Sequence, residues 1–181
     1  MPTIFSHGIA AVSAATLFNS KSEKIKFYVL VLICSCIPDL DVISFKFGIS
    51  YSHWLGHRGI THSILFSILL PIPILFLFYR SVSFFSKEYI VLWIVFFIST
   101  VSHALLDALT NGGLGVCLYC PFKTERFFFD FRPILVSPIG KNFFSEAGIR
   151  VLKSEFVWIW IPSFLVFITF KIAKKLKSVS N

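Results

Sequence analysis

The stretch YIVLWIVFFISTVSHALLDAL, residues 89–109, decides the fold of this chain. A helix needs about 20 apolar residues to cross a hydrocarbon core of roughly 30 Å, and this stretch is long enough. The rest of the sequence agrees, because 56% of the residues are hydrophobic and only 14% are charged, against roughly 25% charged residues in ordinary soluble domains. We therefore expect an all-α integral membrane bundle, and the length of 181 residues predicts a single domain over 1–181.

Four further apolar stretches flank residues 89–109, so that four or five helices are expected in total. They run over 4–18, 25–37, 61–79 and 156–170. By length, 61–79 and 89–109 are expected to span the bilayer, whereas the other three are short. Pro38 is expected to end the second stretch. Pro71 and Pro73 are expected to kink the third.

The one long connection, residues 111–155, is rich in glycine and proline and is expected to be a turn-rich loop. Residues 143–155 within it predict an amphipathic helix lying at the membrane interface. The same loop contains Cys117 and Cys120. A local disulfide or two free thiols fit this pair better than a zinc knuckle, because a second CxxC is absent from the sequence.

Ionisable side chains lie at the ends of these apolar stretches. Placing such groups in a membrane segment costs free energy, so their presence indicates a functional site. His103 and Asp107 are four residues apart, so that on a helix they share one face. Imidazole and carboxylate groups bind borderline and hard metal ions. The alternative is a buried histidine hydrogen-bonded to a carboxylate. Asn111 is one turn further along, before Gly112 and Gly113, which are expected to end the helix.

Two more motifs carry the same residue types. Asp39 and Asp41 follow the second stretch, where two negative charges oppose the helix dipole and a cation would relieve their repulsion. The alternative for them is solvated loop acids. The motif HRGITHS, residues 57–63, places His62 in the first turn of the third helix with Thr61 as its N-cap. The alternative here is an interfacial loop whose arginine pairs with lipid headgroups.

If the five stretches alternate in direction, the starts of the odd ones and the ends of the even ones face one membrane surface. The candidate metal ligands all lie there: His7, Asp39, Asp41, His57, His62, His103 and Asp107. We therefore predict a site for one or two divalent ions, with zinc as the expected metal. Asp39 is the candidate general base or second-metal ligand. Arg58 is the other catalytic candidate, as a partner for phosphate.

The segment 127–140, FFFDFRPILVSPIG, is aromatic and basic and predicts a flap over the site that binds a lipid headgroup. Its alternative is an interfacial aromatic belt. The candidate substrate-binding residues are Arg58, Asn111, Arg126 and Arg132.

The basic residues predict the orientation. The end opposite the site holds nine Lys and Arg against two acidic residues, whereas the site end holds eight against seven. Because cytoplasmic loops carry the excess of basic residues, the site is expected to face outward and the C-terminus the cytoplasm. The net charge of +8 then indicates attraction to anionic lipids rather than nucleic acid. A transporter is disfavoured because mid-membrane positions hold only Cys, Ser, Pro and apolar residues.

Six motifs together resemble a known family. They are His7-Gly, PDLD (38–41), HRGITHS (57–63), HALLDALTNGGLG (103–115), RPILVSPIG (132–140) and LKSEFVWIWIP (152–162). This set is similar to the YdjM-like family of LexA-regulated, membrane-bound metal-dependent hydrolases of bacteria. The resemblance covers nearly the whole chain and implies a small helical protein of the inner membrane with hydrolase activity. An SOS response belongs to the family name alone.

The order of these ligands is also, more weakly, similar to the zinc-dependent phospholipase C and nuclease group. That similarity implies one zinc on Asp41, His62, His103 and Asp107, and a second on His7 with a bridging carboxylate. A third metal is not expected, because no histidine follows His103. The resulting expectation is metal-dependent hydrolysis of a phosphoester in a lipid or lipid-linked substrate. The alternative is a non-enzymatic membrane protein with a structural metal.

Overall fold

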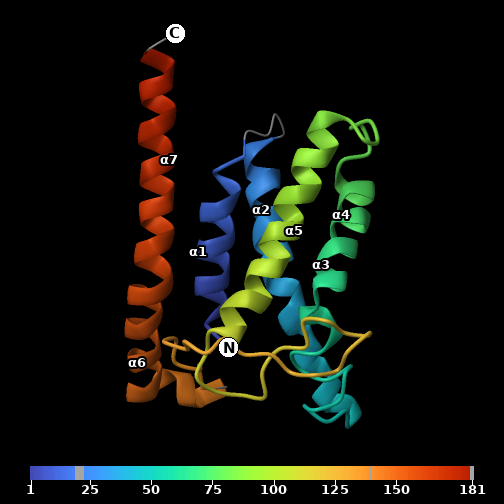
Figure 1. The fold of residues 1–181 in the computed structure, drawn as a ribbon, viewed down its shortest axis with the longest axis vertical. Helices are drawn as coiled ribbons and strands as arrows, with labels where there is room; N and C mark the ends of the chain where they lie inside the picture. The colour runs from blue at the N-terminus through green and yellow to red at the C-terminus, as the bar shows by residue number, and fades with distance from the viewer. Residues whose placement is uncertain (19–22, 139, 180–181) are drawn as a thin grey trace.

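The computed structural model describes residues 1–18, 23–138 and 140–179. Helices dominate this part of the chain, which contains no strand and two isolated bridges, so the all-α expectation is confirmed. The helices are α1 (Ile4–Ala15), α2 (Lys24–Cys36), η1 (Ile37–Phe47), η2 (Ile60–His62), α3 (Ile64–Leu69), α4 (Pro71–Phe78), α5 (Lys87–Ala108), η3 (Gly140–Phe144), α6 (Glu146–Glu155), η4 (Phe156–Trp160) and α7 (Ile161–Val179). In Figure 1, α1, α2, α5 and α3–α4 run alongside one another, α7 lies beside α1, and the long loops gather at one end.

The central helix α5 corresponds to the stretch that decided the fold. It has 22 residues, long and apolar enough to cross a membrane, as the sequence predicts. Ser86 caps its start by accepting a hydrogen bond from the backbone N–H of Tyr89. Its end at Ala108 comes before Gly112 and Gly113, so the prediction that these glycines end the helix is wrong.

The α-helix α2 ends at Cys36, just before Pro38, as the sequence predicts, but the residues that follow form a helix and not the expected loop. The chain continues from α2 directly into the 3-10 helix η1, with Pro38 in its first turn. Proline is tolerated there because the first N–H groups of a helix have no intrahelical partner. Together, Lys24–Phe47 form a 24-residue candidate span. Asp39 and Asp41 therefore lie within a helix rather than after one.

The third apolar stretch is shorter than predicted. Pro71 lacks an N–H and begins α4, so the stretch is divided into α3 and α4. Ile64–Phe78 falls below the length of a candidate span, which contradicts the expectation that this stretch crosses the bilayer.

The N-terminal cap of α3 is Ser63, whose Oγ accepts from the N–H of Phe66 at 3.0 Å. The expected cap, Thr61, donates instead to Asp41.

The helix expected at the interface over 143–155 is the beginning of the last helix. It runs on from α6 through the π-helical turn η4 into α7, and Glu146–Leu176 together form a 31-residue candidate span. The candidate spans therefore include the second and fifth stretches, which the sequence indicated to be short.

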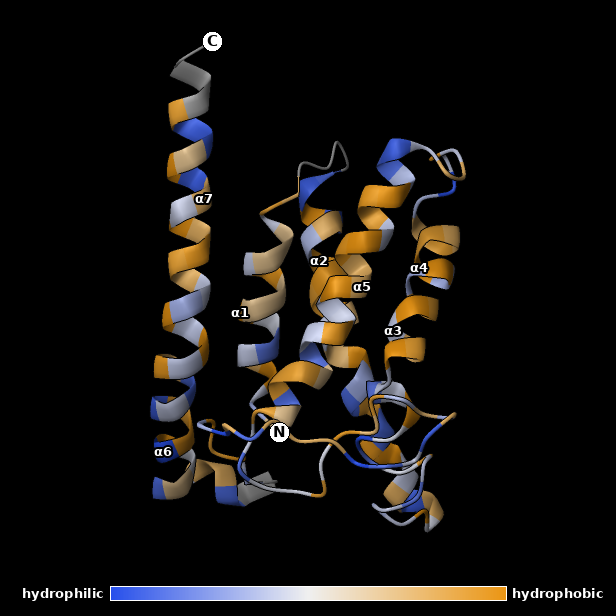
Figure 2. Cartoon of the chain, in the orientation of Figure 1, coloured by the Kyte–Doolittle hydropathy of each residue, from blue (hydrophilic) through white to orange (hydrophobic). Residues whose placement is uncertain are grey.

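The hydrophobic core lies between α1, α2, α4 and α5. Ala11 and Ala15 of α1 are buried, and their small side chains allow α1 to approach α2 and α5 closely. Large residues such as Phe27, Leu92 and Phe96 fill the remaining space. Figure 2 shows hydrophobic residues along most of the helices and hydrophilic residues gathered toward both ends, including the end with the long loops. The ionisable cluster lies at this loop end.

Candidate metal centre

Four ionisable side chains from three separate elements meet at the loop end of the bundle. They are Asp39 of η1, His62 of η2, and His103 and Asp107 of α5. Nε2 of His103 lies 3.1 Å from Nε2 of His62 and 3.2 Å from Oδ1 of Asp39. Nε2 of His62 lies 3.4 Å from Oδ2 of Asp107 and 3.7 Å from Oδ1 of Asp39. One ligand atom from each residue lies within 4.8 Å of the ligand atoms of the others, close enough to share one ion.

The spacing of these atoms fits a divalent metal ion. Bonds of about 2.0–2.2 Å to a tetrahedral zinc separate neighbouring ligand atoms by roughly 3.3–3.6 Å, close to the four distances in this cluster. Oδ1 of Asp39 and both carboxylate oxygens of Asp107 are buried without a hydrogen-bond partner. Buried carboxylate oxygens are costly unless a cation or a donor satisfies them. These residues can hold a metal ion.

Each histidine of the cluster is oriented through its other ring nitrogen. Nδ1 of His103 lies 2.6 Å from the carbonyl oxygen of Ser35, which can only accept a hydrogen bond. The proton of His103 must therefore be on Nδ1, which leaves the lone pair on Nε2 free for a metal. Nδ1 of His62 lies 3.1 Å from Oδ2 of Asp41, which favours the same tautomer. Both Nε2 lone pairs then face the common centre.

The charges around the centre also favour a divalent cation. Asp39, Asp41 and Asp107 contribute three negative charges, and Arg58 beside Asp107 contributes one positive charge. Burial lowers the pKa of His62, but the carboxylates of Asp107, Asp39 and Asp41 outweigh that effect and raise the pKa well above its usual value. The cluster therefore attracts positive charge, and two positive charges would balance it.

Asp41 and His57 lie next to the four-residue cluster. Oδ1 of Asp41 is hydrogen-bonded to Nδ1 of His57 at 2.6 Å. Oδ2 accepts from the N–H of Arg58 at 2.9 Å and from the hydroxyl of Thr61 at 2.7 Å. The zinc-enzyme similarity implied Asp41 in the four-ligand set, whereas the structure has Asp39 in that place. With Asp39, these two residues form a second group of possible ligands.

His7 of α1 reaches the edge of the cluster. Its ring stacks on that of His103 with 3.7 Å between centroids and 12° between planes. Nε2 of His7 lies 3.6 Å from Oδ1 of Asp107, and neither ring nitrogen has a hydrogen-bond partner. His7 is therefore close enough to contribute to a second ion beside Asp107.

Arg58 lies inside the site, with 1% of its surface exposed. Its Nε is 2.9 Å from Oδ2 of Asp107, Nη1 donates to the carbonyl of Gly112, and Nη2 donates to the hydroxyl of Thr110. Its backbone has φ of 59°, a left-handed conformation that is uncommon outside glycine. The guanidinium therefore compensates the charge of Asp107.

The other candidate substrate-binding residues are further from the centre. The Nη1 and Nη2 groups of Arg126 donate to backbone carbonyls, among them those of Tyr51 and His57, and so hold the loops together. Arg132 is exposed, with its guanidinium over the ring of Phe128. Oδ1 of Asn111 accepts from the N–H of Val136. None of these contacts brings the three side chains to the four-residue cluster.

Sequence reasoning gave no role to Ser35, and it assigned Thr61 to a cap. Ser35 acts through its backbone carbonyl, which has no signature in the sequence. Thr61 stands within the HRGITHS motif between two histidines, so a role in orienting a carboxylate was detectable there in principle.

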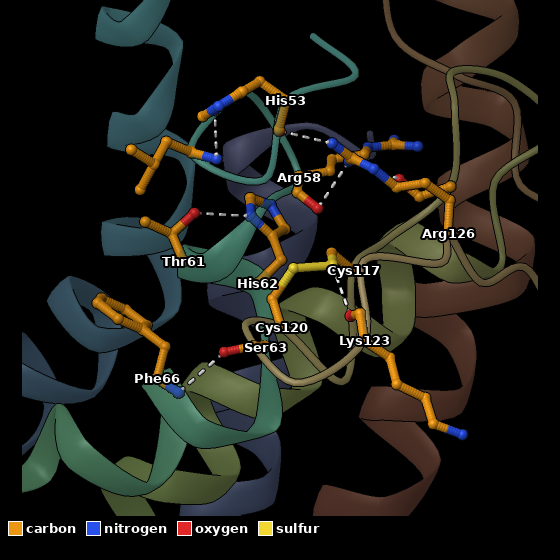
Figure 3. Close-up of a disulfide and its surroundings, with 12 residues drawn as sticks. His53, Arg58, Thr61, His62, Ser63, Phe66, Cys117, Cys120, Lys123 and Arg126 are labelled. Carbon is orange, nitrogen blue, oxygen red and sulfur yellow. Dashed lines mark hydrogen bonds between the residues drawn. A yellow bond between two sulfur atoms is a disulfide. The ribbon is translucent and has the colours of Figure 1, made fainter.

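A disulfide supports the site from the loop side. Cys117 and Cys120 are bonded, which confirms the local-disulfide alternative. Their loop pairs with the HRGITHS segment, because the N–H of Cys117 donates to the carbonyl of Arg58 and the N–H of Ile64 donates to that of Leu118. Figure 3 shows the disulfide next to the segment that carries Arg58 and His62.

Comparison with known proteins identifies the family. A model described as YdjM inner membrane protein matches residues 1–177. This chain belongs to the YdjM family. The inner membrane protein YbcI of Escherichia coli (strain K12) is similar, with 35% identity over 167 residues, which cover 92% of this chain and 95% of the relative. No solved structure matches.

Membership of the YdjM family confirms the resemblance seen in the sequence motifs. Together with the three candidate spans, it places the protein in the inner membrane. The YdjM-family protein therefore has a set of possible metal ligands at one end of a membrane bundle.

Proposed function

We propose that this protein is a metal-dependent hydrolase that cleaves a phosphoester of a membrane lipid or lipid-linked substrate. The observation that carries the proposal is the convergence of Asp39, His62, His103 and Asp107, whose buried carboxylate oxygens include three without a hydrogen-bond partner. A divalent ion, for which zinc is our candidate, would lower the pKa of water to about 7 and polarise a phosphoryl oxygen. Asp39, His62, His103 and Asp107 would hold it.

The accessible side of the cluster indicates where a substrate would approach. The side chain of Asp39 is 17% exposed, whereas those of His62, His103 and Asp107 are fully buried. Water and a phosphate group would therefore reach the centre past Asp39. This position suits Asp39 to accept a proton from water, the role of general base. Arg58 would act by positioning, because it keeps Asp107 ionised and fixed.

A second candidate function is a purely structural metal site in a non-enzymatic membrane protein. One observation favours it: two histidines and two carboxylates already supply four ligands, and structural zinc sites are closed at four. The partly exposed Asp39 favours the enzyme, because a carboxylate at the surface can shift to admit water.

We further propose that the metal end faces the periplasm. Disulfides form and persist in the bacterial periplasm and are rare in the cytosol, and Cys117–Cys120 lies in the loop that supports this end. The distribution of basic residues independently favours the same orientation. Anionic lipids of the cytoplasmic leaflet would then attract the Lys-rich opposite end.

The test is metal content and phosphate release for detergent-purified protein, with wild type beside His103→Ala, Asp107→Ala and the control His53→Ala. His53 is an exposed histidine outside the cluster. We expect one or two equivalents of zinc or another divalent metal in wild type and control, lost in both site variants. We also expect hydrolysis of phospholipids or polyprenyl phosphates in liposomes that requires the metal.

The two candidate functions predict different results. Metal lost in the variants, with no hydrolysis of either lipid class by metal-loaded wild type, would support the structural site. Absence of metal in wild type, with none regained on addition, would refute both candidates.

A further inference from the structure

An apolar groove of about 900 Å³ runs between α1 and the last helix. Ligand sites in proteins measure roughly 300–1,000 Å³, so this groove is large enough for a sizeable molecule. α1 contributes Ile4, Gly8 and Ile9, whereas η4 and α7 contribute aromatic residues such as Phe164. Figure 1 shows α7 beside α1 at the edge of the bundle. The last helix is a candidate membrane span and α1 is a shorter apolar helix, so that an apolar molecule of the bilayer could enter the groove from the side.

The four candidate ligands do not line the groove, but two of its lining residues, Gly8 and Cys36, are close in sequence to the metal centre. Cys36 lies at the end of α2. From Cys36 the chain enters the 3-10 helix η1, in which side chains three residues apart lie on the same face. Asp39 is three residues after Cys36 and so lies about one 3-10 turn beyond this end of the lining. On the opposite wall, Gly8 directly follows His7.

Polar contacts hold the groove at a fixed width. Nε1 of Trp160 donates to Oγ of Ser6 at 2.7 Å, and Oγ of Ser13 donates to the carbonyl of Ser163 at 2.5 Å. These bonds join α1 to the last helix at two levels. Gly8 lets α1 approach α2 closely beneath the groove, because an added Cβ at this position would come 2.9 Å from the side chain of Leu32. The groove is therefore defined by fixed contacts.

We propose that this groove holds a fatty-acyl chain of a membrane phospholipid, with the phosphate headgroup lying toward Asp39. The proposal rests on the proposed function, since it identifies the substrate as a phospholipid of the surrounding bilayer. The lining is almost wholly apolar and aromatic, which suits hydrocarbon. None of the lining residues is charged, so the phosphate headgroup would lie outside the apolar part of the groove, toward the metal centre.

The test is photocrosslinking in liposomes with a phospholipid that carries a diazirine on one acyl chain. The variant is Ile9→Trp, which fills the groove, and the matched control is Ile68→Trp. Ile9 and Ile68 are 36% and 37% exposed, but Ile68 lies on α3, outside the groove. We expect wild-type labelling concentrated on α1 and on 156–167, reduced at least fivefold by Ile9→Trp and unchanged by Ile68→Trp. Metal content should be the same in all three proteins.

Other outcomes would overturn the proposal. Labelling spread evenly over all lipid-facing helices, or unaffected by Ile9→Trp, would show that the groove holds no acyl chain. A polyprenyl phosphate that displaces the phospholipid probe at equal concentration would assign the groove to a different lipid. Groove labelling together with no hydrolysis of phospholipids or of polyprenyl phosphates would instead refute the proposed function and leave the acyl-chain site in place.

Discussion

His62 shows at the scale of single residues how the centre is built. Asp41 lies 3.1 Å from its Nδ1, whereas Asp39 and Asp107 lie near its Nε2. A 3-10 helix has three residues per turn, so side chains two apart point about 120° away from one another. Asp39 and Asp41 can therefore reach opposite sides of one imidazole. This arrangement gives Asp39 the place of a ligand and Asp41 that of an orienting carboxylate.

We predict that Asp41→Asn weakens metal binding by about 10–100-fold, the usual effect of losing a carboxylate that orients a ligand. Asp39→Asn, which removes a ligand oxygen, should weaken it more. Both are measured by competition with a chromophoric zinc chelator. If Asp41→Asn instead removes one whole equivalent from a two-metal protein, Asp41 is itself a ligand of the second ion.

At the scale of elements, Glu155 joins the last helix to the first. This fully buried carboxylate accepts from the N–H and hydroxyl of Thr3 and from the hydroxyl of Ser6. These groups lie at the N-terminus of α1, where the helix dipole stabilises a negative charge. The π-helical turn η4 begins immediately after Glu155. The carboxylate therefore anchors the wall of the groove to α1.

We predict that Glu155→Ala destabilises the protein by about 1–3 kcal/mol, because the buried N–H and hydroxyl donors of Thr3 and Ser6 lose their acceptor. Glu155→Gln, which keeps an acceptor oxygen, should cost less. Thermal unfolding in detergent measures both, with the exposed Glu146→Ala as the control.

Metal content distinguishes anchoring from ligation. It should be retained in folded Glu155→Ala, because the four ligands come from η1, η2 and α5. Loss of metal from protein that remains folded would show that α1 and the last helix are needed to form the centre.

At the scale of the whole molecule, the two ends of the bundle differ in chemistry. One end carries the ligand cluster and the Cys117–Cys120 disulfide. The sequence places most of the unbalanced basic residues at the other end. An orientation with the first end in the periplasm satisfies both the redox requirement and the charge asymmetry.

We predict that a green fluorescent protein fused to the C-terminal end fluoresces and that alkaline phosphatase fused there is inactive. Protein denatured without reductant should take up two alkyl groups, on Cys34 and Cys36, and four after reduction. Active alkaline phosphatase at this end would contradict the proposed orientation. Four reactive thiols before reduction would show that the disulfide is absent and remove the redox argument for that orientation.

The sequence by itself determined that the protein is a helical membrane bundle with its ionisable residues at one end. Hydropathy is a property of each local segment, so residues 89–109 and the other apolar stretches are enough to predict membrane helices. The alternation of helix direction then follows from short connections. The YdjM resemblance was likewise readable from short motifs.

Only the tertiary structure decided which residues share the centre. The 3-10 helix η1 follows α2 without a break, and its turn brings Asp39 rather than Asp41 toward His103. Arg58 is inside the site because a buried Asp107 needs a positive partner. Contacts between segments far apart in the chain fixed each of these choices, and no local pattern encodes such contacts.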